Sequence, residues 1–593
     1  MTFVTLATYF SKLEKTASRN EMTVILAQLF SEARSEEIDK ICYLSLGRLG
    51  PKFTAVEFNL AEKMMIRVLA KAYKKGEEQV KREFKKIGDF GDVAYKLKIK
   101  NEKLKNEIQN SKLSVNDVYK RLYDIAAESG EGSVERKIEK LSKLISALDS
   151  LSAKYIIRIP LNKLRLGFSD MTILDALSWM IAGDKSKRAE IEGSYNIRAD
   201  VGQIAKKLKI TNYKLKIEIK NSKLRIKKLI DTLRLLKPQI GTPIIPALCQ
   251  RLPTAEKMIE KMGKVAVEPK YDGQRLQIHF SKKKTAIFTR NLDNVTQMFP
   301  DIVEVLAKEV KGKSVILDGE VIGIDPKTGR FLPFQETIKR KRKYQIKEMV
   351  KEIPLKVFCF DILYKNGQDL LKKPFSKRRK ILEKILSSSN AIIVISPQIV
   401  TDDPQVILDY HDEQIKKGLE GAVLKKWQSP YDPGKRGYTW VKFKQEKGKK
   451  GGGLADTLDC VVMGYYRGKG RRAIFGIGAF LVGIRKNENF LTISKIGTGL
   501  SDEQWRELKL KIKNEKLKIK EKPKEYIVDK NLTPDVWTAP GLVVEIEADN
   551  ITKSPIHTAQ YALRFPRLVC FRNDKSPDQA SNLKEVEKLY KLQ

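Results

Sequence analysis

A segment rich in proline and glycine, residues 236–253 (LKPQIGTPIIPALCQRLP), separates two regions of different texture. Before it, stretches such as VERKIEKLSKLISAL and TILDALSWMIAG repeat apolar residues at the spacing of amphipathic helices. After it, short runs rich in valine, isoleucine and aromatic residues predominate, for example SVILDGEVIGID and LKVFCFDILY. Because proline and glycine interrupt regular structure, we expect a domain boundary here, with an all-α domain over residues 1–236.

A second boundary is predicted by a lysine- and glycine-rich segment that contains Gly448–Gly453 and that we expect to act as a flexible hinge. The strands and helices before it predict an α+β domain with antiparallel strands over residues 240–447. After it, runs such as DCVVMGYY, IGAFLVGI and FLTISKIG surround one helical stretch. This pattern predicts a small β-barrel of the OB type over residues 454–593. The length of 593 residues also favours several domains over one core.

Three lysine- and asparagine-rich segments resemble one another: Lys96–Leu113, Lys207–Leu224 and Lys509–Lys518. They do not recur at a fixed period, which excludes a solenoid. We interpret them as one element inserted into loops, near residues 96–113, 207–224 and 509–522. The interpretation predicts that deletion of residues 96–113 leaves activity nearly intact.

The formal net charge of +42 indicates a polyanionic partner, either nucleic acid or, as the alternative, an anionic membrane surface. No apolar run is long enough to span a membrane, and the N-terminal residues are typical of an amphipathic helix rather than a signal peptide. We therefore expect a cytoplasmic protein. The five cysteines form no CxxC pair and there are only three histidines, so a zinc site, a disulfide framework or histidine-based catalysis is not expected. Catalysis would rest on lysine, arginine and carboxylates.

A lysine in a strand-like run, Lys270 in VAVEPKYDGQRLQIHF, is the strongest candidate for chemistry. A lone match to KxDG means little, because a lysine at the end of a strand is commonly solvated. Further motifs follow it in order, however: FTRN, LDGEVIG, VFCFDILY, EGAVLK, GKRGYTWVKFK and LRFPR with NDKSP. Their joint occurrence in this order indicates one shared site.

Together these motifs resemble those of ATP-dependent DNA ligases of the archaeal and eukaryotic replicative type, within the covalent nucleotidyltransferase superfamily. RLGFSDMTILDAL and NIRADVGQIAKKL resemble the helical DNA-binding domain of that family, and PDVWTAPGLVVEIEADNITKSPIHTA resembles its C-terminal OB domain. The resemblance covers nearly the whole chain outside the three repeated segments. It implies a DNA-binding domain, an adenylation domain and an OB domain, with ATP and Mg²⁺ as cofactors. It also implies the sealing of 5′-phosphate/3′-hydroxyl nicks in duplex DNA during replication, repair and recombination, through Lys270–AMP and AMP–DNA.

The resemblance assigns roles to individual residues, with Lys270 as the nucleophile. Glu268 would contact the adenine edge, Phe360 would stack on the adenine ring and Glu320 would bind the ribose. The full nucleotide-binding set that it implies is Glu268, Arg275, Arg290, Glu320, Phe360, Arg436, Lys442, Lys444, Arg564, Arg567 and Lys575, of which the last three would grip pyrophosphate. Mg²⁺ would lie at Glu320 and Glu420. Lys163 and Arg165 would contact the DNA backbone, although an ordinary helix-capping loop explains them almost as well.

The chemistry of an attacking amine adds one expectation. A free lysine has a pKa of about 10.4 and must lose a proton before it attacks. We expect Arg275, Lys442 and Lys444 to lower the pKa of Lys270 if the fold brings these cations together. A depressed pKa would appear in the pH profile of adenylylation.

Two alternatives remain open from the sequence: an RNA-sealing ligase of the same superfamily, and a catalytically inactive DNA-binding scaffold. An NAD-dependent ligase is disfavoured because no four-cysteine cluster is present. We expect a monomer that binds nicked double-stranded DNA, with a sliding clamp as a candidate protein partner and no membrane contact. The sequence does not distinguish ATP from ADP or GTP.

Overall fold

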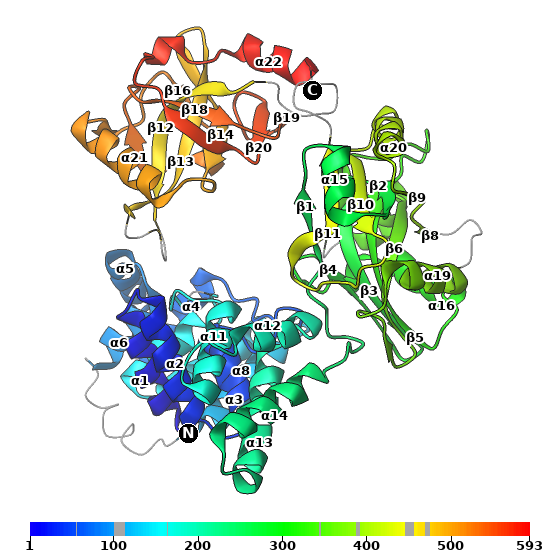
Figure 1. The fold of residues 1–593 in the computed structure, drawn as a ribbon. Coiled ribbons are helices and arrows are strands. Elements are labelled where there is room, and N and C mark those ends of the chain that lie inside the picture. The colour runs from blue at the N-terminus through cyan, green and yellow to red at the C-terminus, as the bar shows by residue number, and fades with distance from the viewer. Residues whose placement is uncertain are drawn as a thin grey trace.

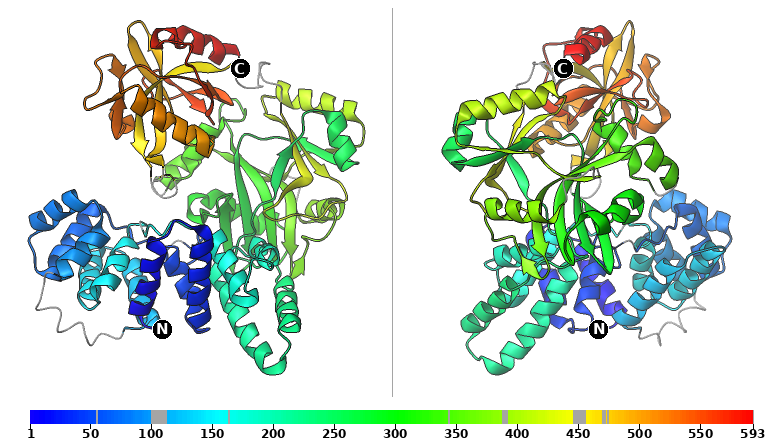
Figure 2. Two further views of the ribbon diagram at one scale, coloured as in Figure 1. Left: turned by 60° about the vertical axis from the view of Figure 1, so that its left-hand side comes forward. Right: turned by 90° about the vertical axis from the view of Figure 1, so that its right-hand side faces the viewer.

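The computed structural model of the 593-residue chain describes all residues except 55, 100–112, 163, 343–344, 387–391, 445–455, 469–471, 473–474 and 593, together with the side chains of 444 and 592. A helical N-terminal region, a central α+β region and a β-rich C-terminal region follow one another along the chain (Figure 1). The predicted fold class is confirmed. The N- and C-terminal regions lie on the same side of the central region (Figure 2).

The N-terminal region consists of helices that bury one apolar face each in a common core. Local signals start several of them: at α8 the Ser114 and Asp117 side chains form a reciprocal capping box, and at α10 Asp149 caps the first turn. The described helices are α1 (Phe3–Glu14), α2 (Arg19–Glu32), α3 (Ile38–Ser45), α4 (Glu62–Tyr73), α5 (Glu77–Ile87), α6 (Phe90–Ile99), α8 (Val115–Ala127), α9 (Ser133–Ser146), α10 (Ser150–Arg158), α11 (Asp170–Ala182), α12 (Arg188–Ile197), α13 (Val201–Glu218) and α14 (Ser222–Arg234). In the part of the chain that the structure describes, no helix is both long and apolar enough to cross a membrane.

The first repeated segment begins inside the helical core rather than in a loop. Its first residues form the end of α6, and residues 100–112 lie outside the described part of the chain. The buried Lys98 ammonium donates to the carbonyl oxygens of Ile145 (2.9 Å) and Ser146 (3.0 Å). Deleting the segment from Lys96 onward would therefore remove core contacts.

The other two repeated segments also lie in helices. The segment from Lys207 spans most of α13 and the start of α14, and the segment from Lys509 forms the second half of a helix, α21 (Asp502–Asn514). In α21 the buried residues Trp505, Leu508 and Ile512 follow helical spacing. For the described residues of these two segments the prediction of loops is wrong, because apolar residues before them belong to the same buried faces of α13 and α21.

The central region contains two sheets. One has the strand order β1-β11-β10-β2-β9, formed by β1 (Leu248–Arg251), β2 (Val265–Pro269), β9 (Ile399–Thr401), β10 (Gly421–Lys426) and β11 (Arg436–Lys444). The other has the order β4-β3-β5-β6-β7, with β8 beside β6, formed by β3 (Gln274–Ser281), β4 (Lys284–Thr289), β5 (Ser314–Gly323), β6 (Leu355–Lys365), β7 (Gln368–Asp369) and β8 (Ile393–Ile395). Its helices are α15 (Ala255–Met262), α16 (Pro300–Glu309), α17 (Phe334–Thr337), α18 (Ile346–Glu352), α19 (Phe375–Ile385) and α20 (Pro404–Lys416).

The C-terminal region is a curved sheet consistent with an OB fold. Its strands run in the order β15-β17-β12-β13-β14-β16, and β18 pairs with both β12 and β21. The strands are β12 (Leu458–Arg467), β13 (Ile477–Lys486), β14 (Asn489–Ile496), β15 (Lys518–Ile519), β16 (Tyr526–Ile527), β17 (Val536–Thr538), β18 (Val543–Glu547), β19 (Asn550–Lys553), β20 (Tyr561–Arg564) and β21 (Arg567–Phe571). Helix α21 packs on this sheet, and α22 (Leu583–Leu592) closes the region.

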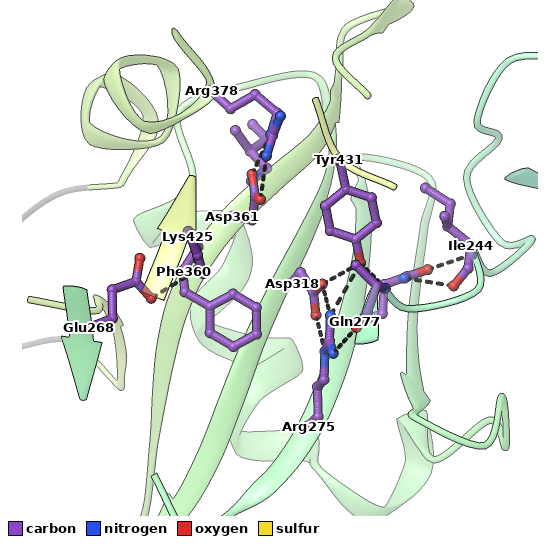
Figure 3. Close-up of polar contacts among 12 residues, drawn as sticks. Ile244, Glu268, Arg275, Gln277, Asp318, Phe360, Asp361, Arg378, Lys425 and Tyr431 are labelled. Atoms are coloured by element: carbon purple, nitrogen blue, oxygen red, sulfur yellow. Dashed lines mark hydrogen bonds and ion pairs between the residues drawn. The ribbon is translucent and has the colours of Figure 1, made fainter. Parts of the chain in front are cut away.

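The proline-rich linker after α14 is bonded to both regions that it joins. The Gln277 amide on β3 bonds the linker in two directions, accepting from the backbone N–H of Ile244 (2.8 Å) and donating to its carbonyl (3.0 Å; Figure 3). On its other side, the Ile245 N–H donates to the carbonyl of Asn196 in α12 (2.8 Å). The linker is therefore fixed by hydrogen bonds to both regions.

A buried histidine supports the same linker. His279 accepts a hydrogen bond at Nδ1 from the Gly241 N–H (3.2 Å), so its other nitrogen, Nε2, is the donor to the Gln277 carbonyl oxygen (2.8 Å). Its ring contacts Phe288 edge-on. Burial lowers the pKa of His279 to about 3. The ring is therefore neutral at ordinary pH.

We expect the free energy of unfolding to fall as the pH decreases below about 6.5, where an unfolded histidine gains its proton. Folded His279 stays neutral until about pH 3, so the unfolded chain binds the additional proton throughout this window. The loss from His279 alone is about 2 kcal/mol at pH ~5. Urea unfolding of wild type and His279→Asn, each above pH ~6.5 and at pH ~5, isolates the contribution of His279, since all carboxylates are common to both proteins. Equal pH slopes in the two proteins would contradict this account.

Candidate active site

Lys270 lies immediately after β2, where the chain leaves one sheet of the central region and enters the other. Its backbone is tied to the start of β10: the Lys270 N–H donates to the Gly421 carbonyl (2.8 Å), and the Glu420 N–H donates to the Lys270 carbonyl (3.1 Å). Gly421 has a φ of +123°, and a Cβ there would lie 2.4 Å from the Phe443 carbonyl oxygen. Only glycine fits this turn, which places Glu420 beside Lys270.

A cavity of about 740 Å³ opens in front of Lys270. This volume lies in the range of small-molecule and cofactor sites, about 300–1,000 Å³. The cavity is lined by most of the residues that the sequence predicted for the site: Glu268, Lys270, Arg275, Arg290, Glu320, Phe360, Glu420, Arg436, Lys442 and Arg564. The fold thus brings together side chains that are distant in the sequence.

The Lys270 ammonium forms an ion pair with Glu420. Burial by itself would lower the pKa of Lys270, but the nearby charges of Glu420 and Glu320 outweigh burial and raise it above the ordinary value. The prediction of a depressed pKa is therefore wrong for the protein without nucleotide. The carboxylates, rather than Lys442 and Arg275, dominate the surroundings of the amine.

Carboxyl groups gather beside this lysine. Burial raises the pKa of Glu320, on β5, to about 7. Burial and the neighbouring Glu420 also raise the pKa of Asp272. Among the described residues, no group of three or more His, Cys, Asp or Glu side chains is arranged to hold a metal by itself. The acids do fit Mg²⁺, which usually takes one or two carboxylates together with substrate phosphates.

The buried pair Glu268–Lys425 forms the floor of the cavity. The Lys425 ammonium donates to Glu268 Oε2 (2.8 Å) and to the Phe360 carbonyl (3.2 Å), and both side chains of the pair are at most 3% exposed (Figure 3). The ammonium also lies over the rings of Phe360 (4.3 Å) and Trp440 (4.6 Å). The second oxygen, Glu268 Oε1, is buried and accepts no hydrogen bond. This oxygen is the kind of acceptor that a bound ligand can satisfy.

Arg275 is held by a network that the sequence did not predict. Its guanidinium donates to both oxygens of Asp318 (3.0 and 2.7 Å) and to the Ala247 carbonyl (2.7 Å). The Tyr431 hydroxyl donates to Asp318 (2.7 Å) and accepts from Arg275 (3.2 Å; Figure 3). The paired charge of Asp318 outweighs burial and raises the pKa of Arg275. Asp318 stands in the DGE motif, but no local signal in the sequence pointed to Tyr431.

The C-terminal region supplies one wall of the cavity. Arg564 pairs with Asp272 (3.6 Å) and lies 5.8 Å from the ring centre of Phe334. The two other cations predicted beside it lie elsewhere: Arg567 pairs with Asp549 (3.3 Å) and Lys575 with Asp459 (2.6 Å), and neither lines the cavity. The structure therefore brings only Arg564 of this trio to the site.

Other predicted positions lie outside the cavity or outside the described residues. Arg165 is half exposed and pairs with Asp89 (3.0 Å). Lys163, the Gly448–Gly453 segment and the side chain of Lys444 fall outside the part of the chain that the structure describes. The backbone of Lys444 pairs with Gly421, the glycine beside Glu420.

The whole chain is similar to known ligases. Family descriptions match in three consecutive parts: "DNA ligase N terminus" over residues 2–178, "ATP dependent DNA ligase domain" over 246–444 and "ATP dependent DNA ligase C terminal region" over 475–575. The "Probable DNA ligase" of Dictyoglomus thermophilum is 42% identical over 100% of this chain and 98% of its own length. The "DNA ligase" of Saccharolobus solfataricus is 37% identical over the same shares.

Solved structures add agreement in fold. The structure titled "Pmar-Lig_PreS3" is similar with a TM-score of 0.52 at 18% identity, over 96% of this chain and 99% of its own. The sequence matches extend across the helical region, the two-sheet region with Lys270 and the C-terminal region alike. The chain belongs to the ATP-dependent DNA ligase family.

Proposed function

We propose that this ligase seals 5′-phosphate/3′-hydroxyl nicks in duplex DNA through a covalent Lys270–AMP intermediate. The observation that carries the proposal is the position of Lys270, with Glu420 at its amine and the unbonded Glu268 Oε1 in the floor of the same cavity. A covalent intermediate divides a difficult phosphoryl transfer into easier steps.

The steps follow from the chemistry of an amine and two phosphate groups. The Lys270 amine, after losing its proton, attacks the α-phosphorus of ATP, so that a P–N bond forms and the bond to pyrophosphate breaks. The 5′-phosphate of the nick then attacks the same phosphorus and releases the lysine. Finally the 3′-hydroxyl attacks the 5′-phosphate, joins the strand and releases AMP. The ion pair of Lys270 with Glu420 must open before the amine can lose its proton.

The same cavity suits the parts of the nucleotide. We assign Glu268 Oε1 to the amino group of adenine, Phe360 to the face of its ring and Glu320 to the ribose. The phosphates would be faced by Arg275, Arg290, Arg436, Lys442 and Lys444. Pyrophosphate would be faced by Arg564, and also by Arg567 and Lys575 once the C-terminal region has moved. Arg275 would also keep the cavity wall in place through Asp318.

We assign Mg²⁺ to Glu320 and Glu420. Burial raises the pKa of Glu320, and burial with the neighbouring Glu420 raises the pKa of Asp272; a bound cation would oppose both shifts. When bound, the ion neutralises charge that develops on the phosphates. Glu420 would then exchange its lysine partner for the ion, which removes the main cause of the raised pKa of Lys270.

The domain roles are also part of the proposal. We divide the chain into a DNA-binding domain (1–236), an adenylation domain (240–447) and an OB domain (454–593), with Gly448–Gly453 as the hinge. Lys163 and Arg165 would contact the DNA backbone. The same proposal includes roles in replication, repair and recombination, a monomeric state, a sliding-clamp partner and a location at the nucleoid in the cytoplasm. The charge of +42 supports the binding of DNA.

A pulse–chase assay tests this function. The protein is incubated with α-³²P-labelled ATP and Mg²⁺ and then chased with nicked duplexes of DNA or RNA. We expect label on the protein and its rapid discharge by nicked DNA, with a sealed strand as product. Faster sealing of RNA would establish the RNA-ligase alternative, and no label with ATP, GTP or NAD would leave an inactive DNA-binding scaffold.

A further inference from the structure

A second large concavity lies at the end of the central region that is remote from Lys270. Its volume is about 820 Å³, and it is lined by the tip of the β3–β4 hairpin, by α16 and by the residues between α16 and β5. Strand β3 begins near the active site and ends here, a distance of roughly 20 Å at the rise of an extended strand. The nucleotide cavity and this groove can therefore be occupied at the same time.

The rim of the groove is strongly basic. Lys282, Lys283, Lys284 and Lys313 line it and are all exposed. No aspartate or glutamate is among the described residues that line the groove, and none of these lysines takes part in an ion pair within the described part of the chain. The rim thus presents uncompensated positive charge.

The floor of the groove is apolar. Phe280 and Val310 are each 6% exposed there, and Val303 and Ala307 of α16 complete the floor. Lysines at an exposed sheet edge also protect a protein from pairing with other sheets. Protection of the sheet edge does not require an apolar concavity between the lysines. Binding of a nucleic-acid phosphate backbone would not use such a concavity either.

The groove also borders an incomplete sheet edge. Strand β4 is the outermost strand of its sheet. At Ile287 its outer edge is covered, because the Ile287 N–H donates to Thr296 Oγ1 (2.9 Å) and its carbonyl accepts from the Val295 N–H (2.9 Å). Backbone groups that face one edge of a strand recur every second residue. The N–H and C=O of Thr285 therefore face the same outer edge of β4 as those of Ile287, on the side of the groove.

From these observations we infer that the groove is a docking site for an extended, acidic segment of a partner protein. The segment would bond the backbone of Thr285, place carboxylates against Lys282, Lys283 and Lys313, and lay alternate apolar side chains on the α16 side of the groove. The two-residue alternation of a strand suits a groove that is charged at its rim and apolar at its floor.

The inference is tested on the full-length chain with a fluorescein-labelled peptide that alternates Glu or Asp with Leu or Val. A second peptide of equal charge carries serine at every apolar position. We expect the first peptide to bind about tenfold more tightly, and the triple variant Lys282→Glu/Lys283→Glu/Lys313→Glu to weaken its binding by about tenfold or more. Ala307→Trp, at an exposed position in the floor, should weaken binding by filling the groove.

The matched control is Lys377→Glu/Lys380→Glu, which reverses exposed lysines on α19 of the same region. It should leave peptide binding unchanged, and all variants should retain wild-type self-adenylylation, which reports folding. Equal binding of the two peptides, or unchanged binding in Ala307→Trp, would overturn the inference. Either result would instead indicate a general anion patch of the kind that holds DNA phosphates.

Discussion

Replacement of Lys270 by alanine is expected to abolish self-adenylylation, with a loss of about 10³-fold or more. The Lys270 amine is the attacking group, and it lies in the cavity in an ion pair with Glu420. The measurement is transfer of label from α-³²P-ATP to the protein. Lys257→Ala, an exposed lysine on α15, is the matched control and should react like the wild type.

The same variant should still act on one substrate. A nick that already carries AMP on its 5′-phosphate needs no Lys270–AMP, so Lys270→Ala should seal it at a rate within about tenfold of wild type. This second assay separates loss of the nucleophile from loss of the fold. Failure on both substrates would point to misfolding, whereas label on Lys270→Ala would assign the nucleophile to another residue.

Replacement of Lys425 by methionine should destabilise the central region by about 3–5 kcal/mol, because the buried carboxylate of Glu268 loses its hydrogen-bonded counter-charge and keeps only the longer contact with Arg379 (3.9 Å). Both side chains are nearly fully buried, so water cannot replace the lost partner. Hydrogen–deuterium exchange of β2 and β10 peptides in increasing urea measures the change. Lys426→Met, half-exposed at the next position, should change stability by less than about 0.5 kcal/mol.

A double variant identifies the cause. Glu268→Gln/Lys425→Met removes both charges and should recover most of the lost stability. If Lys425→Met alone is no less stable than Lys426→Met, the buried pair does not hold a full charge.

Periodicity and motif order were sufficient to predict the three regions and most of the residues that line the cavity at Lys270. The spacing of apolar residues predicts helices such as α9 and α11, and residues such as Glu320 and Phe360 belong to local motifs. The second and third repeated segments were wrongly predicted to lie in loops, because each contains only part of an amphipathic pattern. In α21, Trp505 and Leu508 precede the repeat and complete the face that Ile512 belongs to.

What the sequence could not provide is the balance of charges in three dimensions. Lys270 and Glu420 are far apart in the chain, so their ion pair, and with it the direction of the pKa shift of the lysine, depends on how β2 meets β10. The Tyr431 hydroxyl that joins Asp318 to Arg275 has no local signature. The groove beside β4 likewise arises only when the hairpin tip meets α16.

The floor under the nucleotide cavity has a consequence for behaviour on heating. It rests on three buried ion pairs, Glu268–Lys425, Asp318–Arg275 and Asp361–Arg378. Hydration of a free charge becomes less favourable as temperature rises, so the cost of keeping such pairs away from water declines while the gain from apolar burial levels off. The floor of this cavity should therefore lose its structure later on warming than the apolar cores around it, and the shape of the cavity should persist close to the melting temperature of the chain.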